Sequence, residues 1–76
     1  MNLPAVLTVK ETAAELLTDR QIEILLAYAR SGSYKVAARQ LGIAPSTVRA
    51  TLVNVRERLG VTRSIQAVLK VFGQVA

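Results

Sequence analysis

The fold of this chain is decided by residues 34–59, YKVAARQLGIAPSTVRATLVNVRERL. Apolar residues recur in this stretch at spacings of three and four on both sides of Gly42, which is the period of one face of an α-helix. Gly42 favours the left-handed backbone that ends many helices, and Pro45 suits the first position of the next one. The stretch therefore predicts two helices joined by a short turn, Gly42-Ile43-Ala44.

The residues around this turn suit a steep crossing of the two helices. Ala38 is small enough to let the two backbones approach, Gly42 opens the turn, and Val48 fills the angle between the helices. Two short helices that cross steeply over a turn containing glycine form a helix-turn-helix. In DNA-binding proteins with this motif, the second helix lies in the major groove.

The flanking segments have the same helical period, so we expect an all-α fold of four helices. The apolar positions expected to face the core are Ile22, Leu25, Leu26 and Ala29; Tyr34, Ala37, Ala38 and Leu41; Val48, Leu52, Val55 and Leu59; and Ile65, Val68, Leu69 and Phe72. Residues 17–76 are predicted to form the domain. Residues 1–16 are predicted to form an arm, or a short extra helix over residues 9–17.

Capping residues predict where the helices begin and end. Thr18 with Gln21 forms the pattern of a capping box, and Ser33 and Thr62 are favourable N-caps for the second and fourth helices. The N-cap of the third helix is Ala44, whose side chain cannot accept a hydrogen bond. Glycines expected in left-handed backbone after the apolar stripes are Gly32, Gly42, Gly60 and Gly73.

Composition narrows the class of function. The formal net charge is +5, and residues 30–76 hold eight Lys or Arg against one acidic residue, which fits a polyanionic partner. The chain has no cysteine or histidine, so zinc fingers and thiol or histidine catalysis are excluded, and we expect neither an enzyme nor a metal or other cofactor. No apolar run approaches the ~20 residues of a membrane span, so we expect a cytoplasmic protein associated with the nucleoid through DNA.

The exposed side of the predicted third helix carries the candidate DNA contacts. These are Ser46, Thr47, Arg49, Ala50, Val53, Asn54 and Arg56. Arg49 has the donors for bidentate pairing with guanine and Asn54 has the groups that pair with adenine, while Ala50 and Val53 suit thymine methyl groups. Ser46 and Thr47 stand at the helix start, where phosphate oxygens bind. By contrast, Arg20 with Glu23 is interpreted as a structural polar pair, and Arg30, Arg39, Arg58 and Lys70 as a solvated face.

Much of the chain resembles the LuxR-type, GerE-like helix-turn-helix DNA-binding domain in a stand-alone layout. The matching residues are Leu17, Thr18, Arg20, Glu23 and Leu25; Gly32, Ser33, Lys35 and Ala38; Leu41, Gly42 and Ile43; Thr47, Val48 and Arg49; Asn54 and Val55; and Leu59, Gly60, Val61, Arg63, Ala67 and Val68. The resemblance implies a four-helix domain that binds paired half-sites as a homodimer. It also implies base contacts by Arg49, Ala50 and Val53, and backbone contacts by Lys35, Thr47 and Arg63.

The resemblance further implies that the dimer forms through the last helix. With the apolar stripe of that helix turned inward, Ala67, Val71 and Gln74 are the residues expected at the dimer interface. The predicted function is a sequence-specific transcription regulator on a pseudo-palindromic site in double-stranded DNA, without a small-molecule ligand. Two alternatives act by binding protein: a module like region 4 of a sigma factor, which binds RNA polymerase, and a truncated regulator that pairs with a full-length relative.

Overall fold

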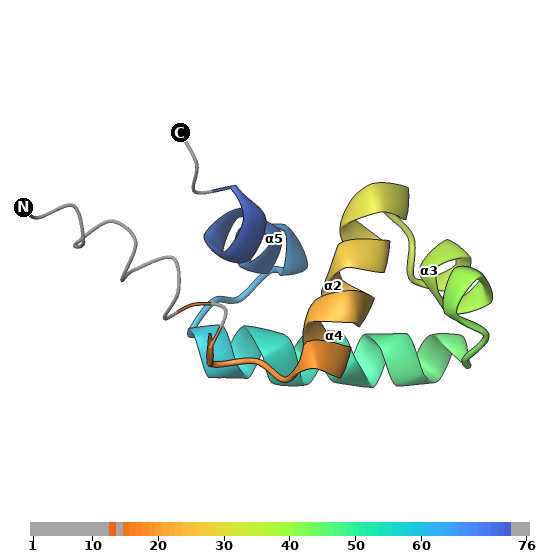
Figure 1. Cartoon of the computed structure of the whole chain (residues 1–76), viewed down its shortest axis with the longest axis horizontal. Coiled ribbons are helices and arrows are strands. Elements are labelled where there is room, and N and C mark those ends of the chain that lie inside the picture. Colours follow the sequence, from red (N-terminus) through yellow and green to blue (C-terminus); the bar gives the residue numbers. More distant parts are fainter. Residues whose placement is uncertain (1–12, 14, 74–76) are drawn as a thin grey trace, which may run out of the picture.

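The computed structural model describes residue 13 and residues 15–73, and four helices account for most of this part (Figure 1). The helices are α2 (Asp19–Ser31), α3 (Tyr34–Leu41), α4 (Pro45–Leu59) and α5 (Ser64–Phe72). None of the described residues lies in a β-strand, so the prediction of an all-α, four-helix fold is confirmed. The extra helix expected over residues 9–17 falls mostly outside the described residues.

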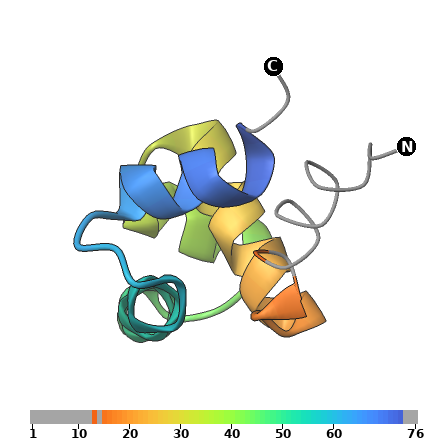
Figure 2. The ribbon, with the colours of Figure 1, turned by 90° about the vertical axis from the view of Figure 1, so that its left-hand side faces the viewer.

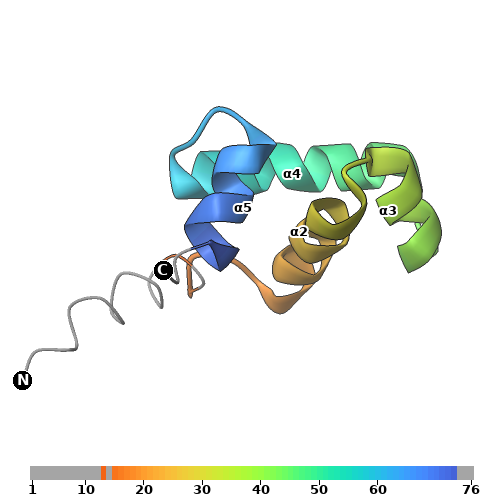
Figure 3. The same ribbon diagram turned by 90° about the horizontal axis from the view of Figure 1, so that it is seen from above.

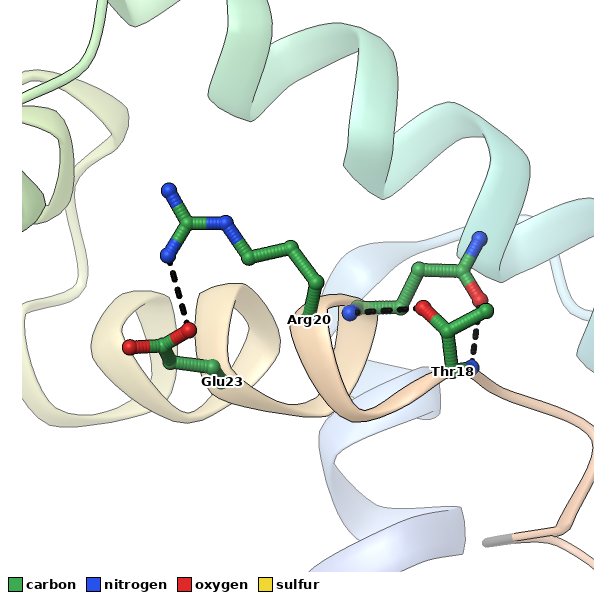
Figure 4. Close-up of polar contacts among 4 residues, drawn as sticks. Thr18, Arg20 and Glu23 are labelled. Atoms are coloured by element: carbon green, nitrogen blue, oxygen red, sulfur yellow. Dashed lines mark hydrogen bonds and ion pairs between the residues drawn. The ribbon is translucent and has the colours of Figure 1, made fainter.

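Most of the helix starts follow the capping residues of the sequence. In the capping box of α2, the amide of Gln21 donates to Thr18 Oγ1 at 3.0 Å, and the amide of Thr18 donates to Gln21 Oε1 at 2.9 Å (Figure 4). Ser33 caps α3 by accepting from the amide of Val36 at 3.3 Å. Ala44 precedes α4 and makes no side-chain capping bond. These three expectations are confirmed.

The start of α5 differs from the prediction. Its N-cap is Arg63, not Thr62. The reason is Gln66 at the third helical position, because its side-chain oxygen accepts from the amide of Arg63 at 2.9 Å and from that of Thr62 at 3.1 Å. The side chain that makes the capping bonds is therefore that of Gln66, within the helix. The N-cap residue itself does not need a hydroxyl group to accept a hydrogen bond.

Three of the four expected left-handed glycines are confirmed, with φ of 72° at Gly32, 70° at Gly42 and 71° at Gly60. The tight turn between α3 and α4 depends on the second of these, since L side chains are disfavoured in that backbone region. Gly73 was expected to be left-handed, and this was wrong: its φ is −96°, and its amide donates to the carbonyl of Leu69 at 2.9 Å.

The helices α2, α3 and α5 all lie on one side of α4, whose outer side they leave uncovered (Figures 2 and 3). α2 packs against each of the other three helices, and α4 packs also against α3 and α5. The predicted inward stripe of α4 is confirmed, because Val48, Leu52, Val55 and Leu59 are all buried. Among the described residues, no polar or charged side chain is buried, so the core is held by apolar packing. Each buried aliphatic side chain of this size contributes about 1.5–3 kcal/mol.

The buried side of α2 differs in part from the expected one. Leu25 is fully buried as predicted, but Ile24 and Ala27 are buried as well, and Ala29 is exposed. The cause is the position of α2 between three other helices, which covers a wider arc of its surface than a single apolar stripe provides.

The expected inward stripe of α5 is confirmed only in part. Val68 and Phe72 are partly buried and pack against the core, but Ile65 and Leu69 are exposed. Ala67 is fully buried and Val71 is 9% exposed, whereas Ile65 is 54% and Leu69 is 57% exposed. α5 packs closely on α2 and α4, and small side chains permit that approach. Ala67 and Val71 therefore belong to the core and not to a dimer interface. Gln74, the third residue predicted at that interface, lies outside the described residues.

Candidate nucleic-acid interface

The outer side of α4 carries most of the residues predicted to contact DNA. Ser46, Thr47, Arg49, Ala50, Val53 and Asn54 are all exposed on it. This helix of 15 residues is about 22 Å long. A helix with one uncovered side fits the width of the major groove of B-DNA. The packing of the other helices on the opposite side leaves this surface accessible.

The N-terminal end of α4 gathers two cations and a hydroxyl. Lys35 from α3 joins Pro45, Ser46 and Arg49 from α4 around one shallow hollow, with Tyr34 as a further wall. The first turn of α4 contains no acidic residue. The N-terminus of a helix is the positive end of its dipole, and the two cations add to this charge. The local field at this end of α4 therefore favours an anionic group such as a phosphate.

An aromatic contact fixes Arg49 within this hollow. The guanidinium carbon of Arg49 lies over the ring of Tyr34, 5.3 Å from its centroid. The Tyr34 ring is in turn stacked on that of Tyr28 in α2, with 5.9 Å between the centroids and 30° between the planes. The three side chains connect the end of α2, the start of α3 and the start of α4.

Two other predicted DNA contacts, Asn54 and Arg63, lie apart from this cluster. Asn54 lines a separate hollow with Gln21, Glu57 and Arg58. Arg63 is exposed at the N-cap of α5, beyond the C-terminal end of α4, and so at the opposite end of that helix from Lys35. The structure thus brings Lys35, Ser46 and Arg49 together, and places Arg63 elsewhere.

Arg56 has a contact within the protein that the sequence pattern did not indicate. Its side chain is partly buried and donates to Ser64 Oγ at 2.9 Å. Ser64 is the first residue of α5, so this bond joins the C-terminal half of α4 to the start of α5. The guanidinium is thereby directed toward the α4–α5 junction.

Three further basic side chains are also bound by the protein itself. Arg20 pairs with Glu23 at 2.7 Å on the surface of α2, as predicted (Figure 4). Arg58 donates to the carbonyl of Leu16 at 3.1 Å. Lys70 donates to the carbonyl of Leu59 at 3.2 Å. The interpretation of Arg58 and Lys70 as a merely solvated face was therefore incomplete.

The comparison with protein families gives a match that covers the helix-turn-helix. The model of the bacterial regulatory helix-turn-helix proteins of the lysR family matches residues 19–62, more than half of the chain. The chain belongs to this family. The matched range begins at the first residue of α2 and runs past the end of α4, and so includes the turn and the whole outer side of α4. No similar curated protein and no similar solved structure was found.

The lysR-family match corrects the resemblance to the LuxR type. Both the LuxR-type and the lysR-family assignments rest on a helix-turn-helix. The residues that pack the turn of this motif do not distinguish one family from the other. Part of the LuxR-like pattern, including Ala67 and Val68, lies beyond the matched range. As a lysR-family helix-turn-helix domain, the chain is a DNA-binding regulator of transcription. Within the described residues, no helix is long and apolar enough to span a lipid bilayer.

Sequence reasoning missed four residues on the surface of the lysR-family domain. Tyr34 was assigned to the core by its place in an apolar stripe, yet its ring also carries the contact to Arg49. Tyr28, which supports that ring, was not singled out. Ile65 and Leu69 were assigned to the core and are exposed. The amphipathic character of tyrosine is the one signal that could have indicated the first pair.

Proposed function

We propose that this chain is a sequence-specific DNA-binding regulator that acts as a homodimer. α4 lies in the major groove, and two copies place their α4 helices in successive major grooves of a pseudo-palindromic site, about 34 Å apart. The observation that carries the proposal is the uncovered outer side of α4, with Arg49 and Lys35 gathered at its N-terminal end.

The proposed contacts divide between bases and backbone. Arg49, Ala50, Val53 and Asn54 lie along the outer side of α4, where side chains reach base edges. Lys35, Ser46 and Thr47 surround the start of α4, and they suit phosphate oxygens. Arg63 is exposed at the far end of the helix, where it suits the backbone beyond the bases contacted by α4.

The proposed dimer forms through the exposed apolar side of α5. Ile65 and Leu69 are four residues apart, and so lie one above the other on that helix. Each leaves more than half of its surface in water. In a twofold dimer the same patch is used by both copies, so two residues per chain give four buried side chains. These two residues replace Ala67 and Val71 as the basis of the proposal.

The proposal is tested by selecting bound sequences from a random duplex library and titrating the selected site at two salt concentrations. We expect a twofold-symmetric consensus with half-sites about ten base pairs apart. Affinity should fall steeply with salt, because phosphate contacts release condensed counterions. Weak, salt-sensitive binding without a consensus would contradict sequence-specific recognition.

The exposed pair on α5 also supports a second candidate function, in which the chain acts by binding another protein. The partner is then RNA polymerase or a larger regulator that covers Ile65 and Leu69. Apolar contacts persist in high salt, whereas DNA binding fails there. A chain that stays monomeric at high concentration but forms a salt-resistant complex with such a protein would favour this second function.

A further inference from the structure

We infer that Tyr34 is a positioning residue that holds the Arg49 guanidinium where it can pair with a base. The inference rests on the proposed function and assigns to Tyr34 a part of the sequence specificity of that function. It starts from the contact of 5.3 Å between the Arg49 guanidinium carbon and the Tyr34 ring centroid.

The contact leaves the hydrogen-bonding capacity of Arg49 intact. A cation over an aromatic ring is attracted through its charge, and this uses none of the five N–H donors of the guanidinium. Among the described residues, no acidic side chain forms an ion pair with Arg49. The group is therefore localised by the ring while its donors remain available for the O6 and N7 atoms of a guanine.

The ring itself is held in place from behind. Tyr34 is partly buried, and its ring stacks on that of Tyr28 from α2. The backbone amide of residue 36 is capped by Ser33, which fixes the first turn of α3 at the position of Tyr34. Tyr34 is thus a rigid platform, whereas Arg49 is an exposed side chain with several rotatable bonds.

Localising Arg49 before binding reduces the conformational entropy that it loses when it pairs with a base. This smaller entropy loss strengthens binding at a site where Arg49 pairs with its guanine. It has no effect at a site where that guanine is replaced. Tyr34 should therefore increase discrimination between these two sites. It should have little effect on affinity for random DNA, which depends on phosphate contacts.

The test compares two Kd values, one for the intact selected site and one for the same site with its Arg49-dependent base pair replaced. Discrimination is the second Kd divided by the first. Tyr34→Leu keeps an apolar side chain but removes the ring, and we expect it to lower this ratio about 2–5-fold, the size of an exposed cation–π contact. Tyr34→Phe keeps the ring and should retain the ratio. Affinity for random DNA should be the same in the two variants. Tyr34→Leu also loses the stacking on Tyr28, so both variants are compared at a temperature at which thermal unfolding shows each to be fully folded.

A double-mutant cycle separates positioning from a direct contact of Tyr34 with DNA. If Tyr34 acts through Arg49, then Tyr34→Leu has no effect on discrimination in the Arg49→Ala background. In the free protein, the side-chain proton signals of Arg49 should carry a ring-current shift that Tyr34→Leu abolishes and Tyr34→Phe keeps.

The outcomes that overturn the inference are distinct from those that overturn the proposed function. A chain that selects a consensus but discriminates equally well with Tyr34→Leu overturns the inference alone. Equal losses of discrimination from Tyr34→Leu with and without Arg49 also overturn it. If the unaltered chain selects no sequence at all, the proposed function fails and this inference fails with it.

Discussion

Replacing Leu69 by serine should separate dimer formation from folding. Leu69 is 57% exposed in the single chain, so most of its surface contributes little to folding. A surface substitution of this kind changes the free energy of unfolding by about 0.5 kcal/mol or less. If the proposed dimer forms, the exposed surface of Leu69 is removed from water at the interface. Replacing Leu69 by serine then lowers the free energy gained on association.

The size of the effect follows from the exposed fraction. Complete burial of a leucine side chain is worth about 1.5–3 kcal/mol, so covering the exposed 57% contributes about 0.9–1.7 kcal/mol. A twofold dimer contains two copies of Leu69, and the substitution therefore costs about 1.7–3.4 kcal/mol of association free energy. At 1.4 kcal/mol for each factor of ten, the Kd of the dimer rises roughly 15- to 270-fold.

Sedimentation equilibrium over a range of concentrations measures this Kd directly, and thermal unfolding of the diluted monomer checks the fold. Val53→Ser is the matched control, because Val53 is also an exposed aliphatic residue, at 38%, but lies on α4. It should leave the dimer Kd unchanged and alter DNA binding. An unchanged Kd for Leu69→Ser, or a chain that remains monomeric throughout, would refute the assignment of the interface to this side of α5.

Four further predictions concern single residues. Arg49→Ala should cost about 1–3 kcal/mol at the selected site and relax preference at one base position, measured by repeating the selection; an unchanged consensus would exclude Arg49 from base contact. Lys35→Ala should weaken binding to all DNA alike and lower the salt slope by about 0.9, so altered specificity would contradict its backbone role. Thr18→Ala removes the cap of α2 and should lower stability by about 1 kcal/mol in denaturant unfolding, whereas Thr18→Ser should not. Ala67→Leu should destabilise the monomer by about 1–3 kcal/mol, because Ala67 is fully buried; a stable variant with altered dimerisation would restore it to the interface.

The helix-turn-helix was predictable because its signals are local and agree with one another. The apolar stripe of α4 has strict spacing from Val48 to Leu59, Gly42 ends α3, and Pro45 starts α4. Each signal depends on residues close in sequence, so periodicity and capping are sufficient. The confirmed burial of the stripe then determines which side of α4 is uncovered.

The orientation of α5 was not predictable in the same way. Two nearly opposite sides of this helix carry apolar residues, one with Ile65 and Leu69 and the other with Ala67 and Val71. Periodicity gives the same signal for either, and the larger side chains were assigned to the core. Which side of α5 faces the core depends on how closely the helix packs on α2 and α4. This distance is a property of the assembled fold and not of the local sequence.

Side-chain contacts across the turn were equally beyond the sequence pattern. Tyr34 and Arg49 are far apart in sequence, and they meet because α3 and α4 cross steeply at Gly42. Arg56 lies on the edge of the α4 stripe, where spacing cannot show that it will meet Ser64. The candidate residues could therefore be named from the sequence, but not sorted into those turned toward DNA and those held by the protein.

The charge distribution along α4 indicates which part of the helix enters the groove. The cations at its N-terminal end, Lys35 and Arg49, share a hollow with no acidic lining residue. Toward the C-terminal end, Glu57 is exposed beside Arg58, and Arg58 donates to the carbonyl of Leu16. A carboxylate on the outer side of the helix repels the DNA backbone, and the positive end of the helix dipole lies at the opposite, N-terminal end of α4. We therefore expect the first half of α4 to lie deepest in the groove and Glu57 to remain outside it. The formal net charge of +5 alone does not give this orientation, because it counts the basic side chains held by the protein together with those available to DNA.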